Sequence, residues 1–204
     1  MWGLERRFVP ADEVGQGPLP ARFLTVGWLA ATVLFALAAL PALPEGAAGQ
    51  VTVLALALVL ARLTAVDLAH LLLPNVYTLP LLAAGLVLPP LLGWHGPSAG
   101  VLGAVVGGGV ALGLALGLAL LKGGQAELGG GDIKLMAALG AWVGLFQLPI
   151  ALAVACFLSL GLSFWQPRGA HIPFGPGLCL GLFATLLYPN VLEGLLGSVA
   201  RLIP

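Results

Sequence analysis

The sequence is poor in charged residues. Only 8% of its 204 residues are charged and 60% are hydrophobic, which gives a mean hydropathy of +1.08. These values lie far outside the range of soluble globular domains and indicate an integral membrane protein. The formal net charge is zero, and no basic stretch could neutralise a row of phosphates, so nucleic-acid binding is not expected.

Cysteine is also scarce. Cys156 and Cys179 are the two in the chain, and both fall in apolar runs without a partner at the spacing of metal ligands. We therefore expect two buried small hydrophobic side chains, no metal site and no cofactor. Ten-residue segments of alternating polar and apolar residues are absent too, so the sequence predicts an all-α bundle of transmembrane helices.

Apolar runs close to the ~20 residues that a membrane span needs predict seven transmembrane helices. They cover residues 22–42, 50–68, 76–94, 98–121, 133–147, 148–166 and 174–197. The boundary between the fifth and the sixth rests on Gln147 and Pro149, so six or eight spans stay open. We expect residues 1–21 to form a short polar arm without a cleavable signal peptide, and residues 22–204 to form the membrane domain.

The basic residues predict the orientation of these spans. With the N-terminus in the cytoplasm, the inner ends of the spans collect nearly all of the Lys and Arg side chains, and only Arg201 lies outside. The residues on the inner side are Arg6, Arg7, Arg22, Arg62, Lys122, Lys134 and Arg168. This orientation puts the Asp67–Asn75 connection and the Lys122–Asp132 connection on the same, cytoplasmic side.

Acidic side chains are very few in the apolar part of the chain. From Val51 to the C-terminus they are Asp67, Glu127, Asp132 and Glu193. Because ionisable groups are costly in a bilayer, the two aspartates at the ends of apolar runs predict a functional site. Two carboxylates that lie close together share a proton, so one can accept a proton from water while the other donates one. We expect Glu127 to be a solvated loop residue.

The residues around Asp132 would shape such a site. Gly129, Gly130 and Gly131 permit positive φ and a close approach of an extended substrate strand. A flexible loop in which Asp132 caps the next helix is an alternative interpretation. Lys134 either extends to the cytoplasmic surface or tunes the electric field at Asp132.

Two further features concern the helix ends and the packing. Pro74 is expected to end the helix that carries Asp67, and Asn75 suits the turn before the next span. In the fourth predicted span, glycine recurs at every fourth position in two short runs, Gly103 to Gly107 and Gly109 to Gly117. Such a stripe predicts close packing against another helix.

Three motifs, in this order, resemble the type IV prepilin peptidase family, which are membrane aspartyl proteases of the GxGD type. The first is Asp67-Leu68, followed by Leu73-Pro74-Asn75 and Tyr77-Thr78-Leu79-Pro80. The second begins at Gly129-Gly130-Gly131-Asp132-Ile133-Lys134 and continues to Trp142, and the third is Ile172-Pro173-Phe174-Gly175-Pro176. The resemblance covers nearly all of the predicted membrane part.

The resemblance implies that Asp67 and Asp132 are the catalytic pair of an aspartic endopeptidase in the bacterial cytoplasmic (inner) membrane. Its substrates would be type IV prepilins or pseudopilins, cut after a glycine at the cytoplasmic face. Larger family members carry an N-terminal domain with two Cys-x-x-Cys pairs suited to zinc, which this sequence lacks, so N-methyltransferase activity is not expected. A non-catalytic pilus-assembly scaffold and a small proton- or cation-coupled transporter are the alternatives. The particular substrate and the oligomeric state stay open.

Overall fold

The computed structural model describes residues 32–33, 44, 46–70, 72–121, 129–163 and 174–188. The described residues form five helices, which are α3 (Ala47–His70), α4 (Asn75–Leu91), α5 (Pro97–Leu121), α6 (Gly130–Ser163) and α7 (Gly175–Leu187). The predicted arm, nearly all of the first predicted span and Glu127 lie outside the described residues. Within them the predicted all-helical architecture is confirmed.

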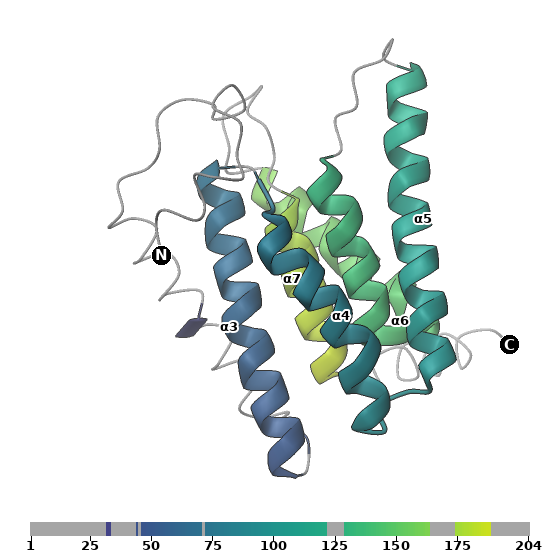
Figure 1. Ribbon diagram of the computed structural model, residues 1–204. Helices are drawn as coiled ribbons and strands as arrows, with labels where there is room; N and C mark the ends of the chain where they lie inside the picture. The colour runs from purple at the N-terminus through teal and green to yellow at the C-terminus, as the bar shows by residue number, and fades with distance from the viewer. Residues whose placement is uncertain are drawn as a thin grey trace, which may run out of the picture.

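The helices form a bundle in which α3 and α5 lie at opposite edges, with α4, α6 and α7 between them (Figure 1). The α3 helix packs against α7, α4 packs against α6, and α6 contacts both α5 and α7. Among the described helices, α3 and α5 are long and apolar enough to cross a membrane, and so is α6 taken over its full length, although it is interrupted at Gly144; α4 and α7 are shorter apolar helices. The count of seven spans stays a prediction.

Helix α6 is interrupted at Gly144, whose φ of 75° and ψ of 171° are not helical. Glycine adopts this conformation readily because it has no Cβ. Before the break, Gly131 lies against Leu73, which precedes α4, and Gly144 lies against His95, which follows α4. After the break, Ser159 lies against the first turn of α7, at the same end of the bundle as Leu73. The chain therefore reverses direction at Gly144.

The interruption corrects the predicted boundary between residues 133–147 and 148–166. Gln147 and Pro149 lie inside the second arm of α6 and do not separate two helices. Apolar residues continue through the break, so hydropathy alone gives no signal for it. The change of direction depends on the backbone of a single glycine.

The glycine stripe of α5 contacts α6 over only part of the helix. A Cβ at Gly103 would strike the backbone of Gly140, and a Cβ at Gly107 would strike the carbonyl of Met136. The predicted close packing is confirmed for these two glycines. No atom would lie within 4 Å of a Cβ at the remaining positions of the stripe, Gly109, Gly113 and Gly117.

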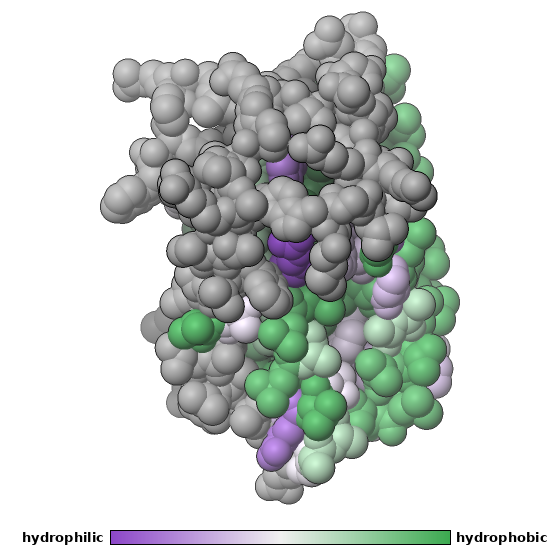
Figure 2. Space-filling model, turned by 60° about the vertical axis from the view of Figure 1, so that its left-hand side comes forward, coloured by the Kyte–Doolittle hydropathy of each residue, from purple (hydrophilic) through white to green (hydrophobic). Residues whose placement is uncertain are grey.

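The surface of the described residues is largely apolar. Leu121, Phe146 and Phe157 are exposed by 85%, 82% and 77% of their areas, and Figure 2 shows hydrophobic residues over most of the described surface on one face. Such a surface suits contact with lipid. Cys179 is buried as predicted, whereas Cys156 is exposed, so the prediction of a buried side chain is wrong for Cys156.

Candidate active site

Asp67 lies in the last turn of α3 and is buried, with only 5% of its area exposed. Its Oδ2 atom accepts a hydrogen bond of 3.0 Å from the backbone N–H of Gly175, the first residue of α7. A buried carboxylate without a partner would be strongly destabilising. The contact between α3 and the start of α7 therefore provides part of the solvation that Asp67 loses.

Asp132 lies in the first turn of α6 and is half-buried. Its backbone N–H donates to the carbonyl of Gly129 at 3.0 Å. The helix already begins at Gly130, so Asp132 is not its N-cap residue, but the Asp132 carboxylate accepts a hydrogen bond from the backbone N–H of Gly129, just before the helix. The carboxyl groups of Asp67 and Asp132 are close enough to interact electrostatically. The fold thus brings the two predicted aspartates to one end of the bundle, which we call the aspartate end.

The three glycines before Asp132 were expected to permit positive φ and the close approach of a substrate strand. None of them has a positive φ, and Gly130 and Gly131 are already helical. A Cβ at Gly131 would lie 2.6 Å from the Cβ of Leu73, so this glycine allows α6 to pack against the segment before α4. No atom would lie within 4 Å of a Cβ at Gly130. Only Gly131 is required for close packing here.

Pro74 and Asn75 lie at the start of α4. Pro74 is the N-cap, and its carbonyl accepts hydrogen bonds from two backbone N–H groups of the first turn. The sequence context of Asn75 suggested a turn before the next span. Instead, Asn75 is the first residue of helix α4. Its Oδ1 atom accepts a hydrogen bond of 2.6 Å from Nζ of Lys134. The sequence did not predict this bond, which joins the first turns of α4 and α6.

The bond between Lys134 and Asn75 should hold the first turn of α6, and with it Asp132, in place. We expect Lys134→Met and Asn75→Ala each to lower the rate of a reaction that depends on Asp132 about tenfold, equivalent to about 1.4 kcal/mol, near the usual value for a hydrogen bond to a charged group. The double variant should lose little more than either single variant, because both remove the same contact. The rates of that reaction in the four proteins test this, and additive losses would show that the two side chains act separately.

Three further residues at the aspartate end were not assigned to the site from the sequence, although Gly175 lies in the third motif; they are Thr64, Gly175 and Cys179. The Cys179 thiol lies beside Thr64 and is close enough to interact with both aspartates. Thr64 precedes Asp67 by three positions and Cys179 follows Gly175 by four. Side chains at these helical spacings share a face. Spacing relative to Asp67 could therefore have identified Thr64, whereas the pairing of α3 with α7 could not be read from the sequence.

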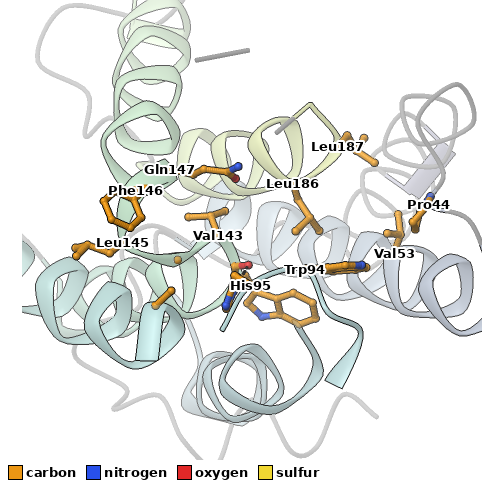
Figure 3. A pocket seen from close by; sticks show the side chains of 13 residues that line it. Pro44, Val53, Trp94, His95, Val143, Leu145, Phe146, Gln147, Leu186 and Leu187 are labelled. Carbon is orange, nitrogen blue, oxygen red and sulfur yellow. Dashed lines mark hydrogen bonds between the residues drawn. The ribbon is translucent and has the colours of Figure 1, made fainter. Parts of the chain in front are cut away.

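A cavity of about 400 Å³ lies at the opposite end of the bundle. Figure 3 shows the side chains of Trp94, Val143 and Leu186 around it. On its wall, Nε2 of His95 lies 3.1 Å from the carbonyl oxygen of Trp142. Neither aspartate lines this cavity. Among the residues that the structure describes, no group of three His, Cys, Asp or Glu side chains could hold a metal ion.

The fold and the two aspartates place the protein in a class, that of helical membrane proteins with two carboxylates at one end of the bundle. Residues 53–164, which include both aspartates, match the Type IV leader peptidase family. This match covers more than half of the chain. The protein therefore belongs to the type IV leader peptidase family, whose members are aspartic-type endopeptidases.

Individual relatives agree with this assignment. A prepilin leader peptidase/N-methyltransferase of Aeromonas hydrophila is 38% identical over 179 residues, which cover 85% of this chain and 60% of the relative. The protein of the same name from Burkholderia pseudomallei is 36% identical over 161 residues, 76% of this chain and 51% of the relative. The chain thus spans little more than half the length of these curated relatives. No solved structure shows significant similarity to it.

Proposed function

We propose that this protein is a membrane aspartic endopeptidase that removes the leader peptide of type IV prepilins or pseudopilins. The observation that carries the proposal is that Asp67, in the last turn of α3, and Asp132, in the first turn of α6, lie at the same end of the bundle and within electrostatic range of each other. Both lie in the region that matches the family. No other acidic side chain of the described helices lies in an apolar segment.

The reaction needs one base and one acid. One aspartate, ionised, takes a proton from a water molecule as the water oxygen attacks the scissile carbonyl carbon. The other, protonated, donates its proton to the carbonyl oxygen, which gives a tetrahedral diol. One hydroxyl group of the diol then returns its proton to the ionised aspartate as the C–N bond breaks, the protonated aspartate gives its proton to the leaving amine, and the leader is released with a new carboxyl group, so the pair again holds one proton. Proton sharing between the carboxylates supplies both roles at one pH.

The unequal exposure of the two aspartates supports this arrangement. Asp67 is buried between α3 and α7, whereas Asp132 is half-buried at the beginning of α6. Water and an extended peptide can therefore approach from the side of Asp132, while the helices exclude bulk solvent around Asp67. Exclusion of bulk water strengthens electrostatic interactions within a site.

Cleavage of a synthetic prepilin tests the proposal. The substrate carries a basic leader that ends in glycine, followed by a hydrophobic helical stem, and the native chain is reconstituted in liposomes. We expect mass spectrometry to find one cut after the glycine, and no cut in a matched substrate with that glycine replaced by leucine. Binding of the substrate without cleavage would favour the scaffold. Proton or cation flux without cleavage would favour the transporter.

We further propose seven spans, with the N-terminus and the aspartate end in the cytoplasm, on the basis of the charge bias of the sequence. In a Cys156→Ser background, Leu121→Cys probes the aspartate end and Gly96→Cys probes the opposite end. Both positions are exposed. In intact cells a membrane-impermeant maleimide should label only Gly96→Cys, and opening the cells should add Leu121→Cys. The reverse pattern would refute this orientation and the cytoplasmic site together.

A further inference from the structure

Gly175, the first residue of α7, is in direct contact with Asp67. Its backbone N–H is the hydrogen-bond donor to Oδ2 of Asp67, at 3.0 Å, and both groups are buried. The first N–H groups of a helix have no partner within the helix. Pro176 follows directly and has no N–H. Gly175 therefore presents the first free donor at the positive end of α7 to a carboxylate, an arrangement that favours negative charge.

The position also leaves no room for a side chain. A Cβ at Gly175 would lie 2.6 Å from Oδ2 of Asp67 and 2.8 Å from its Cγ. Real Cβ atoms do not approach other atoms this closely. The φ of Gly175 is not positive, so the requirement for glycine comes from the nearness of the carboxylate and not from the backbone conformation.

Helix α7 cannot move away to relieve such a contact without losing its packing. A Cβ at Gly177 would lie 2.6 Å from the carbonyl oxygen of Ala155, and Gly181 lies equally tightly against the carbonyl of Ala151. These two contacts hold α7 against the second arm of α6. A larger residue at position 175 would therefore displace the side chain of Asp67.

We propose that Gly175 is a positioning residue for the peptidase reaction. Its N–H fixes Oδ2 of Asp67, which leaves Oδ1 to serve the water and Asp132. This role rests on the proposed function, because Gly175 would act on an aspartate of the proposed peptidase site. The role also explains why α7 begins at Gly175, because there its first N–H reaches Oδ2 of Asp67.

The variant Gly175→Ala tests this role by kinetics. We expect kcat for the synthetic prepilin to fall about 100-fold, the effect of a displacement of about 1 Å at a reacting group. KM and photocrosslinking of the substrate should stay within about threefold, since the substrate itself is not displaced. The matched control is Gly161→Ala on α6, where no atom would lie within 4 Å of the new Cβ. A kcat for Gly175→Ala within threefold of the native value would overturn the proposal.

A second measurement tests the contact without using activity. Gly175→Ala should lower the Tm of the native chain, but should lower it far less in an Asp67→Ala background, where the clashing carboxylate is gone. Equal losses in both backgrounds would overturn the proposal even if the peptidase assay fails. If the native chain does not cleave, the proposed function fails on its own. If Asp67→Asn is inactive while Gly175→Ala is fully active, only the role of Gly175 fails.

Discussion

Asp67→Asn and Asp132→Asn are each expected to lower the rate of prepilin cleavage about 1000-fold or more, within the range for loss of a general acid or base. Asparagine has nearly the shape of aspartate, but it neither accepts nor donates the proton that the reaction transfers. Loss of either carboxylate leaves the other without a partner to share a proton. The two losses should not add in the double variant, because residues that act as one unit fail together.

The asparagine variants are also suited to separating catalysis from folding. The side-chain oxygen of asparagine at position 67 can still accept the hydrogen bond from Gly175. We expect both variants to keep the native Tm within a few degrees and to crosslink the substrate normally. Cys156→Ser, at an exposed position on α6, is the control and should be fully active. An asparagine variant that cleaves within tenfold of the native rate would remove that aspartate from the catalytic pair.

The second large effect concerns stability. Gly103→Ala and Gly140→Ala should each destabilise the bundle by about 3 kcal/mol, the upper part of the usual range for overpacking. At both positions the new methyl group would strike the backbone of the facing helix, since a Cβ at Gly140 would lie against Gly103 and vice versa. A backbone cannot rotate away as a side chain can, so α5 and α6 must separate.

Gly113→Ala is the matched control, because it makes the same change on the same helix. No atom would lie within 4 Å of a Cβ there. Alanine favours helix over glycine by roughly 0.5–1 kcal/mol, so this variant should be neutral or slightly more stable. Thermal unfolding in detergent measures both effects, a lower Tm for Gly103→Ala and Gly140→Ala and an equal or higher Tm for Gly113→Ala. An equal Tm for Gly103→Ala and Gly113→Ala, both on α5, would refute the close contact between α5 and α6.

The class of protein was predictable from the sequence, and so was the presence of two acidic side chains at the ends of apolar helices. A chain this apolar can be accommodated only as membrane helices, and carboxylates are too costly in such segments to be placed without a function. That argument identified Asp67 and Asp132 before any geometry was known. Pro74 likewise predicted the separation of α3 from α4, because proline cannot continue a helix in its interior.

Features that depend on contacts between helices were not predictable. The chain has 30 glycines, and nothing in the local pattern distinguishes Gly144, where α6 breaks, from Gly131, which packs against Leu73. The glycines before Asp132 permit positive φ but do not adopt it, because the helix already starts at Gly130. The bond from Lys134 to Asn75 and the bond from Gly175 to Asp67 both join elements far apart in the sequence, so only the assembled bundle reveals them.

The most direct measurement for the proposed site is the proximity of positions 67 and 132 in the membrane. Asp67→Cys and Asp132→Cys are combined in a chain whose Cys156 and Cys179 are replaced by alanine, and a short bifunctional thiol reagent is added with the synthetic prepilin bound. We predict an efficient crosslink between the two positions. A pair of Asp67→Cys with Gly96→Cys, at opposite ends of the bundle, should give none. Absence of the 67–132 crosslink in a folded, substrate-binding protein would contradict a shared catalytic water.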